Sequence, residues 1–335
     1  MKKLILFFIF LSLLFFYKTE YIDDIKLYLE SITNKSKFQV EENIEYNHNT
    51  DKLKADLSEN FKTIKIGDTK ESVIDKLNEP SRIDNSEYNF KWYVYNNYKE
   101  KFFMIGIEND KVVALFTNNI NSCENESISI DKDINYVRKN FKILKYKDKR
   151  NIRYEISSNN EYDILYINNK YITVFYDKFN NNKIWAYEII EKSSEEKVES
   201  IYPELDKNIE NSLMLEIIDL VNAIRYKHNL NPLSYNEKAT ISARKHSEDM
   251  RNNNYFDHEN LNNETPFDRM TKEGINYTSA GENIAAGQTN SIFVVNGWIN
   301  SDGHRKNILG NYKYIGVGVI FGGNYKTYYT QNFFE

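Results

Sequence analysis

Histidine is the residue type in this sequence that is best suited to acid–base chemistry and metal binding, because its ordinary pKa lies close to neutral pH. The chain has five histidines, and four of them lie after residue 227. His258 and His304 occur in polar segments typical of loops and helix ends, where functional residues concentrate. His228 lies in a polar turn and is expected to be solvated. His246 lies on the apolar stripe of a predicted helix, which favours a hydrogen-bonded core residue.

One acid lies between the two candidate histidines in the sequence. Glu282 is surrounded by glycine and other small residues over 280–287, and such neighbours allow close backbone approach and leave room for a cleft. His258, Glu282 and His304 could bind a divalent metal ion and leave a position open for water or a ligand. Their spacings of 24 and 22 residues do not form a local metal motif. Spacing alone therefore gives the metal site little support.

Nucleophilic catalysis has little support in the sequence. The single cysteine, Cys123, has no catalytic signature around it, and no motif marks a nucleophilic serine. One cysteine also excludes an intrachain disulfide and a four-cysteine zinc site. His258, Glu282 and His304 could instead activate a water molecule on a metal, or Glu282 could act as a general base. Whether these three residues are catalytic is left open.

The region after residue 208 is predicted to consist of helices followed by two strands. Apolar residues recur at helical spacing over 213–224 and 239–250. Thr265 and Pro266 predict the start of a third helix, and a fourth is expected over 290–298. The segments 314–321 and 325–333 alternate as strands do.

Five short segments of this region, taken together, resemble the CAP superfamily, which comprises the cysteine-rich secretory proteins, antigen 5 and pathogenesis-related 1 proteins. They follow one another in the family's order and spacing: HSEDM (246–250), YFDH (255–258), GENIA (281–285), WINSDGHRKNIL (298–309) and IGVGV (315–319). The resemblance covers about residues 211–335 and is to a cysteine-poor bacterial branch. It implies an α-β-α sandwich with a central cleft and a surface tetrad of two histidines and two acids.

Carried over to this chain, the resemblance makes His258 and His304 the tetrad histidines and Glu282 its first acid. The second acid falls at about Ser301, which carries no carboxylate, and the adjacent Asp302 does not clearly replace it. The resemblance therefore implies a weak metal site formed by His258, Glu282 and His304. Zinc or another divalent ion is the expected metal.

Residues 60–192 are predicted to form a separate α+β domain. Helical patterns near 68–79 and 131–141 are each followed by strand-like runs, so that a helix-then-meander unit is repeated. Asn109 and Asp110 predict a hairpin turn. The segment 66–80 and the domain order resemble the CAP-associated N-terminal domain, which implies no catalytic residues. A charged linker is expected over 193–208, and the CAP domain is expected over 209–335.

Residues 1–18 have the pattern of a signal peptide or an N-terminal membrane anchor. Lys2 and Lys3 precede an apolar run from Leu4 to Tyr17. No small-x-small cleavage site follows the run, which favours an uncleaved anchor over a cleaved signal. Residues 19–59 are charged and are interpreted as a stalk or linker. The absence of paired cysteines in an exported chain indicates a bacterial surface protein.

Composition restricts the class of partner. The chain has 335 residues, enough for about two domains, and a net charge of -5 argues against nucleic-acid binding. The sequence thus predicts an exported bacterial cell-surface CAP-domain protein, membrane-anchored or secreted. It is expected to contact the cell envelope through its N-terminal segment and to bind a lipid, glycan or peptide. The alternatives are a metal-dependent hydrolase acting on cell-envelope or peptide substrates and a purely structural surface protein.

Overall fold

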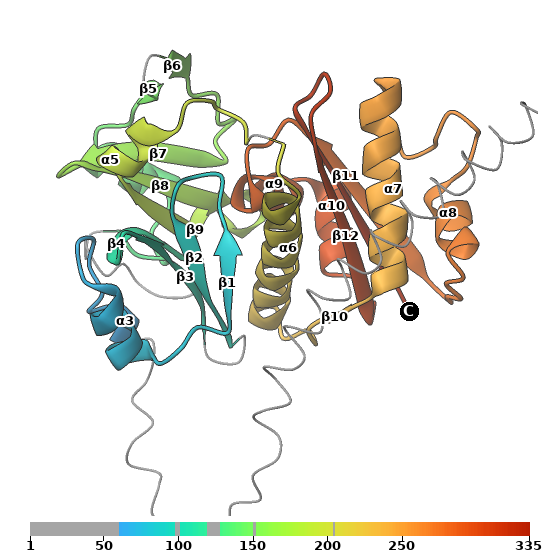
Figure 1. Cartoon of the computed structure of the whole chain (residues 1–335), viewed down its shortest axis with the longest axis horizontal. Helices are drawn as coiled ribbons and strands as arrows, with labels where there is room; N and C mark the ends of the chain where they lie inside the picture. Colours follow the sequence, from blue (N-terminus) through green and yellow to red (C-terminus); the bar gives the residue numbers. More distant parts are fainter. Residues whose placement is uncertain (1–59, 98–100, 119–127, 150–151, 204) are drawn as a thin grey trace, which may run out of the picture. The chain divides into compact units, whose positions relative to one another are not determined.

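The computed structural model describes residues 60–97, 101–118, 128–149, 152–203 and 205–335, whose strands form two main sheets (Figure 1). The predicted anchor at 1–18, the predicted stalk at 19–59 and Cys123 lie outside the described residues. Among the residues that are described, no helix is long and apolar enough to cross a membrane.

The larger sheet has seven antiparallel strands in the order β1-β2-β3-β4-β9-β8-β7. Its strands are β1 (Arg82–Asn85), β2 (Lys91–Asn97), β3 (Lys101–Glu108), β4 (Lys111–Thr117), β7 (Tyr162–Ile167), β8 (Lys170–Asp177) and β9 (Lys183–Glu191). The two predicted meanders are β2–β4 and β7–β9, and they join edge to edge where β4 pairs with β9. The chain between β4 and β7 also forms a separate two-stranded hairpin, β5 (Tyr146–Lys149) and β6 (Ile152–Glu155).

Each meander is preceded by a short capped helix, as the sequence predicts. Helix α3 (Lys70–Leu77) begins after Thr69, whose side chain accepts a hydrogen bond from the amide of Ser72. Helix α4 (Ile134–Asn140) begins after Asp133, which accepts from the amide of Tyr136. Both helices bury apolar residues in one core with the sheet.

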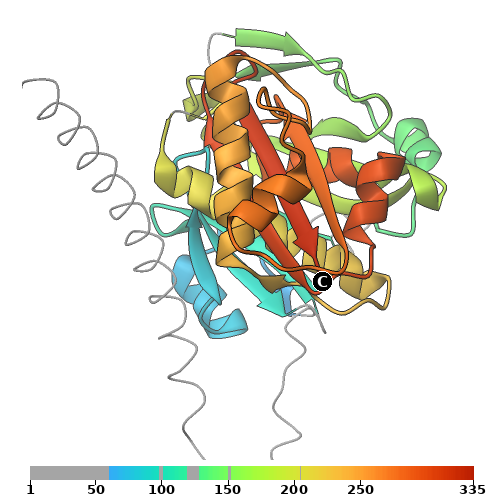
Figure 2. The same cartoon turned by 90° about the vertical axis from the view of Figure 1, so that its right-hand side faces the viewer.

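The smaller sheet has the order β10-β12-β13-β11 and lies between helices (Figure 1). Its strands are β10 (Ser234–Tyr235), β11 (Ala280–Ala286), β12 (Tyr314–Phe321) and β13 (Thr327–Phe334). The helices of this region are α6 (Lys207–Lys227), α7 (Glu237–Asn253), α8 (Pro266–Lys272), α9 (Ser291–Ile299) and α10 (Asp302–Ile308). Helix α7 contacts β12 and β13, and α6 contacts β12. Figure 2 shows α7 and α8, in orange, in front of the red strands, so the predicted α-β-α sandwich is confirmed.

Two glycines of β12 allow α7 to lie directly on the sheet. A Cβ atom at Gly316 would lie 2.2 Å from the backbone nitrogen of Thr240. A Cβ atom at Gly318 would lie 2.3 Å from the backbone nitrogen of Arg244. Both atoms belong to the helix backbone, which cannot move aside as a flexible side chain would.

Polar contacts connect the larger sheet with the sandwich. Arg82 of β1 donates to Asp219 of α6 at 2.7 Å, and Trp185 of β9 donates to Asn296 of α9 at 2.8 Å. The segment 193–208, predicted to be a linker, contains most of helix α5 (Lys192–Lys197) and the first two residues of α6. Glu195 of helix α5 is buried, and the buried Lys147 pairs with it at 2.8 Å.

Candidate functional site

The acid of the predicted site lies on a strand. The segment around Glu282, predicted from its small residues to border a cleft, forms β11 and pairs with β13. A Cβ atom at residue 281 would lie 2.7 Å from Tyr312 Oη and 2.8 Å from Asn307 Oδ1, so a larger residue would have to displace these side chains. The small residue therefore brings the strand close to α10 and the segment that follows it.

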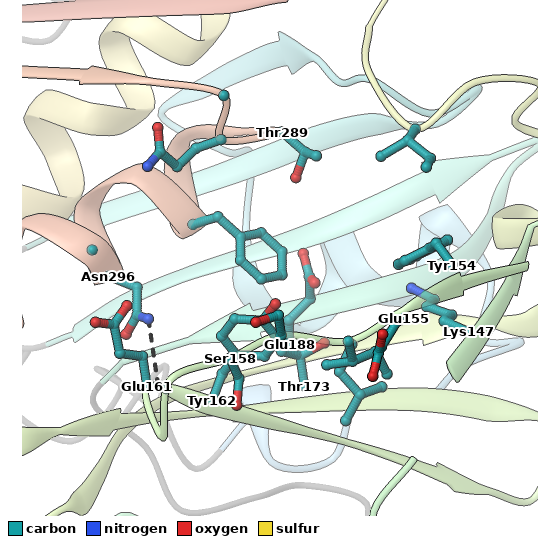
Figure 3. A pocket seen from close by; sticks show the side chains of 18 of the residues that line it. Lys147, Tyr154, Glu155, Ser158, Glu161, Tyr162, Thr173, Glu188, Thr289 and Asn296 are labelled. Atoms are coloured by element: carbon teal, nitrogen blue, oxygen red, sulfur yellow. Dashed lines mark hydrogen bonds between the residues drawn. The ribbon is translucent and has the colours of Figure 1, made fainter. Parts of the chain in front are cut away.

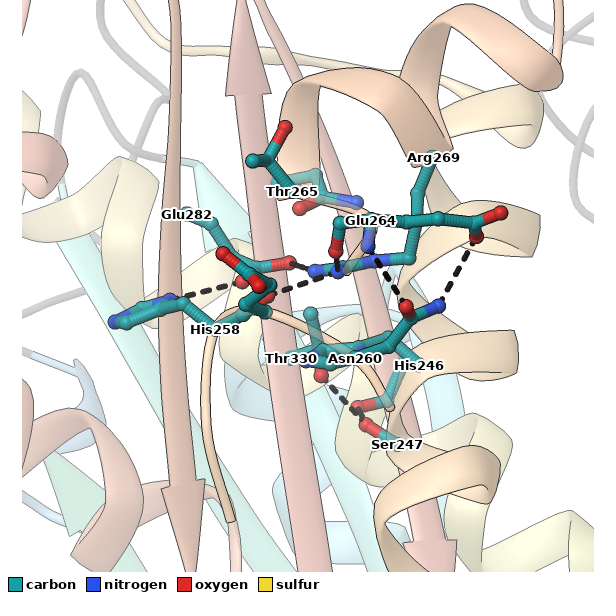
Figure 4. A network of polar contacts seen from close by, with 12 residues as sticks. His246, Ser247, His258, Asn260, Glu264, Thr265, Arg269, Glu282 and Thr330 are labelled. Carbon is teal, nitrogen blue, oxygen red and sulfur yellow. Dashed lines mark hydrogen bonds and ion pairs between the residues drawn. The ribbon is translucent and has the colours of Figure 1, made fainter. Parts of the chain in front are cut away.

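Only 2% of the Glu282 side chain is exposed, and both oxygens of its carboxylate have partners within the protein. Arg269 Nη2 donates to one oxygen at 2.8 Å, and His258 Nδ1 is 2.9 Å from the other. Figure 4 shows Glu282 between these two side chains. A buried carboxylate is stable in its charged form only with such charge-assisted hydrogen bonds.

The contact with Glu282 determines which nitrogen of His258 carries a proton. A carboxylate accepts hydrogen bonds, so Nδ1 must be the donor, and a neutral ring then has its lone pair on Nε2. The side chain is 48% exposed, and in Figure 4 the ring extends away from Glu282. His258 is thus held at one nitrogen and accessible at the other.

The loop that carries His258 is fixed by the same arginine. Arg269 Nη1 donates to the carbonyl oxygens of His258 and Glu264, each at 2.8 Å. Asn260 donates to the Glu264 carboxylate at 3.0 Å. Arg269 therefore positions both Glu282 and the backbone of His258.

The second tetrad histidine lies in α10. Burial lowers the pKa of His304, and the proximity of His258 lowers it further. Both effects favour the neutral form of His304. The carbonyl oxygen of His304 accepts a hydrogen bond from Asn283, the neighbour of Glu282 on β11, at 3.2 Å. The structure thus brings His258 into direct contact with Glu282 and the backbone of His304 beside strand β11.

The other two C-terminal histidines have different roles. His246 is 1% exposed, and its Nε2 donates to the carbonyl oxygen of Asp257 at 2.9 Å. Burial lowers its pKa. The prediction of a hydrogen-bonded core residue is therefore confirmed for His246. His228 is the exposed C-cap of α6.

No carboxylate replaces the second tetrad acid at the predicted position. Ser301 is the N-cap residue of α10, and its side chain makes no capping hydrogen bond. Asn300 is buried and donates to the carbonyl oxygen of Tyr176 at 2.8 Å. Asp302 pairs with Lys306 at 2.6 Å on the exposed face of the helix. The two neighbours of Ser301 are thus engaged elsewhere.

Within the described part of the chain, no group of three or more His, Cys, Asp or Glu side chains is arranged to hold a metal ion. Both oxygens of Glu282 are in hydrogen bonds with other side chains. Direct coordination by all three of His258, Glu282 and His304 stays a prediction.

Sequence reasoning missed the residues that support the cluster. Arg269 belongs to no motif that we recognised, although a buried acid requires a cation nearby. Asn307 donates to the carbonyl oxygen of Glu282 at 3.0 Å and to Asn283 Oδ1 at 2.8 Å. Asn283 and Asn307 lie within the GENIA and WINSDGHRKNIL segments, so the motifs contained a signal for them.

An α-β-α sandwich with a paired histidine and glutamate at one sheet edge is the arrangement expected of a CAP domain. Comparison with known families agrees: residues 218–333 match the cysteine-rich secretory protein family, and residues 66–200 match the CAP-associated N-terminal domain. The chain belongs to the cysteine-rich secretory protein, or CAP, family.

Two proteins of Bacillus subtilis (strain 168) are similar in sequence. The uncharacterized membrane protein YlbC is 33% identical over 293 residues, which cover 81% of this chain and 82% of YlbC. The uncharacterized protein YkwD is 47% identical over 119 residues, or 35% of this chain and 45% of YkwD.

Two solved structures are similar in fold. An extracellular SCP-domain protein of Bacillus anthracis has a TM-score of 0.69 and 28% identity, and the match covers 88% of this chain and 99% of that one. A cysteine-rich secretory protein of Staphylococcus aureus has a TM-score of 0.63 and 16% identity, covering 81% and 91% of the two chains. The second similarity concerns the fold alone.

Proposed function

We propose that this chain binds a lipid, glycan or peptide at the bacterial cell envelope, and that His258, Glu282 and His304 form the binding site. The observation that carries the proposal is the state of His258. Its Nδ1 is held by a buried carboxylate at 2.9 Å, while 48% of the side chain remains exposed. An imidazole oriented in this way presents Nε2 to a ligand with little further loss of freedom.

The contacts of Glu282 favour binding over hydrolysis. A general base needs a carboxylate oxygen within reach of the substrate's proton. Both oxygens of Glu282 are instead in hydrogen bonds with Arg269 and His258. A purely structural role would suit a buried ring bonded to backbone, which describes His246 and not His258.

The loop that carries His258 also offers apolar surface. A hollow of about 510 Å³ is lined by Tyr255, Phe256, Leu261 and polar residues of this loop. Phe256 is 43% exposed and Leu261 is 65% exposed. Exposed apolar side chains beside polar groups suit a ligand that has both an apolar and a polar part.

A divalent ion such as zinc would be held by His258 and His304, with Glu282 orienting His258 from behind. Neutral imidazoles are good zinc ligands, and the lowered pKa of His304 favours that form. A bound ion would polarise an oxygen of the ligand. Binding is expected to be weak because Ser301 supplies no carboxylate.

Zinc titration of the full chain by calorimetry tests this site. We expect His258→Ala to abolish binding and His228→Ala, a matched control outside the cluster, to leave the affinity unchanged. Ser301→Glu should tighten binding about tenfold or more, since ~1.4 kcal/mol from one added ligand is a factor of ten. Equal affinities of wild type, His258→Ala and Ser301→Glu would contradict the assignment.

The envelope location rests on the N-terminal pattern and on the relatives, one described as a membrane protein and one as extracellular. Fractionation of a bacterial host should place the full chain with the membranes and retain the residues before Tyr17. Recovery of a chain that begins near residue 20, free in the medium, would contradict the anchor and indicate a cleaved signal peptide.

A further inference from the structure

A cavity of about 400 Å³ lies between the larger sheet and helix α9. Lys147 of its lining pairs with Glu195 at 2.8 Å. Asn296 donates to the carbonyl oxygen of Glu161 at 3.4 Å, as Figure 3 shows. These polar groups are thus engaged within the protein and are not free to bind a ligand.

A smaller cavity, of about 290 Å³, lies where helix α7, the loop that carries His258 and helix α8 meet. Figure 4 shows His246 of α7, Asn260 of the loop and Arg269 of α8 in this region. The volume is near the lower limit of about 300 Å³ for small-molecule sites. All nine residues that line the cavity are polar or charged. The lining therefore suits a small polar ligand.

Three buried side chains of this lining each have a polar atom that no other described residue supplies with a hydrogen bond. The atoms are Ser242 Oγ, His246 Nδ1 and Arg269 Nε. The three residues are 2%, 1% and 8% exposed. A buried polar group without a partner reduces stability, so native proteins almost always supply one. Three such side chains around one cavity indicate that it takes a polar occupant.

The other contacts of these side chains determine which partner each atom needs. His246 Nε2 is 2.9 Å from the carbonyl oxygen of Asp257, which can only accept, so Nε2 carries the proton. Burial lowers the pKa of His246 and favours the neutral ring, which has a lone pair on Nδ1. His246 Nδ1 therefore needs a donor. Arg269 Nε is always protonated and needs an acceptor, while the Ser242 hydroxyl can donate or accept.

A neutral ligand suits this combination better than a charged one. A carboxylate would face the lone pair of His246, and an ammonium group would face the guanidinium of Arg269. Four charged groups of the lining are already paired with one another: Lys245 with Glu273, and Lys272 with Glu264.

We propose that this cavity binds a neutral sugar, with one hydroxyl group donating to His246 Nδ1 and a neighbouring one accepting from Arg269 Nε. A hydroxyl group can do both, and a sugar ring carries several of them. A lipid chain would gain little from burial against a wholly polar lining. The sugar could be free or the end residue of a glycan. None of His258, Glu282 and His304 lines the cavity, which is therefore proposed independently of their function.

Nitrogen-15 NMR spectra of the histidine rings of the full chain test this cavity. The probes are glucose, galactose, mannose and N-acetylglucosamine, each as the free sugar and as its methyl glycoside. We expect at least one probe to shift the His246 Nδ1 signal saturably, while Nε2 keeps its proton and the His228 signals stay in place. A response that includes the glycosides identifies the end of a glycan as the ligand, and a response to free sugars alone identifies a free sugar.

Two control probes lack the matching chemistry. Tetrahydropyran-2-methanol has the ring of a sugar without the ring hydroxyls, and propionamide carries the amide group of a peptide side chain. Neither is expected to shift the His246 Nδ1 signal.

Ser242→Ala tests the lining of the cavity without removing a hydrogen bond within the protein. We expect the variant to fold as wild type does and to bind the sugar about fivefold more weakly, the effect of losing one neutral hydrogen bond. Ser193→Ala, at an exposed position of α5, is the matched control and should bind as wild type does.

Three results would overturn the proposal: no response of His246 to any sugar, an equal response to either control probe, or equal sugar affinities of Ser242→Ala and wild type. His258→Ala distinguishes the two sites of the chain. It should abolish zinc binding and leave sugar binding unchanged, so failure of one site would not be mistaken for failure of the other.

Discussion

Arg269 is the residue on which the geometry of the candidate site depends most. It is 8% exposed as a side chain, and its guanidinium bonds the Glu282 carboxylate and two carbonyl oxygens of the His258 loop. The planar fork of arginine suits this kind of divided contact, whereas a lysine would supply a single point charge. Loss of the guanidinium would leave Glu282 buried without its cation.

Arg269→Met is therefore expected to destabilise the protein by about 3–5 kcal/mol, the cost of breaking a buried pair by removal of one partner. Urea unfolding measures the change. Arg153→Met is the matched control, since Arg153 pairs with a carboxylate too, that of Asp148, but on the surface. Arg153→Met should change the free energy of unfolding little. An equal loss of stability in both variants would contradict the claim that burial makes the Arg269 pair important for stability.

His246 should make the stability of the protein pH-dependent. Burial lowers its pKa in the folded protein below the ordinary value of 6.5. The unfolded chain then binds a proton more readily, so the stabilisation is present above about pH 6.5 and is lost as the pH falls below it. Unfolding free energies between about pH 7 and pH 5 should fall less steeply for His246→Gln than for wild type. Parallel curves would contradict this origin of the pH dependence.

The residues of the site were only partly predictable from sequence. His258, Glu282 and His304 were identified by residue type and by their place in a family pattern. Arg269 was missed because its role depends on where α8 packs against β11, and a sequence gives no direct signal of that contact. The assignment of the fourth tetrad position to Ser301, which has no carboxylate, stays a prediction.

At the scale of elements, local turn chemistry was the strongest signal. The predicted hairpin turn at Asn109 and Asp110 has φ angles of 49° and 57°, and Asn168 and Asn169 have 48° and 60°. Asparagine and aspartate tolerate this left-handed conformation better than other residues with a Cβ atom. The abundance of asparagine in the sequence thus has a partly structural use.

Elements with weak local signals were missed. Strand β11 has the sequence AGENIAA, whose alanines and glycine have low strand propensity, and it forms because it pairs along its whole length with β13. Strand β1, with the sequence RIDN, is mostly polar and forms because it pairs with β2. Such segments become strands because of tertiary pairing and not because of local propensity.

The contact between α7 and β12 gives a test at this scale. Gly318→Ala should destabilise the protein by about 3 kcal/mol, because the added methyl group meets helix backbone. Gly297→Ala in α9 is the control, since nothing lies within 4 Å of its Cβ position. Alanine there should stabilise the protein by about 0.5–1 kcal/mol, as expected within a helix. Thermal unfolding of both variants provides the comparison, and similar effects would contradict the close approach.

At the scale of the whole molecule, the two matched regions share a polar interface. Arg305 of α10 pairs with Asp177 at 3.0 Å, in addition to the contacts of Arg82 with Asp219 and of Trp185 with Asn296. The separate α+β domain predicted over 60–192 and the charged linker predicted over 193–208 would allow the two regions to unfold independently. Contacts of this kind favour coupled unfolding, because breaking them exposes buried polar groups on both sides.

The three tryptophans can report on this coupling, since Trp92 and Trp185 lie in the larger sheet and Trp298 lies in α9. Fluorescence of Trp298→Phe follows the larger sheet, and fluorescence of a Trp92→Phe/Trp185→Phe variant follows the sandwich. Circular dichroism measures the overall stability of each variant. After correction for that stability, we expect the two fluorescence transitions to occur at the same urea concentration. Two separated transitions in one variant would show independent domains.

The central claim is that His258 is held by Glu282 at Nδ1 and offers Nε2, beside His304, to a ligand or metal ion. Nitrogen-15 NMR spectra of the imidazole rings, recorded with and without zinc, test it most directly. Without zinc we predict that His258 carries its proton on Nδ1. With zinc the signals of His258 Nε2 and of the His304 ring should shift together, while those of His246 and His228 stay in place. A proton on Nε2 of His258, or a zinc response confined to other histidines, would contradict the account.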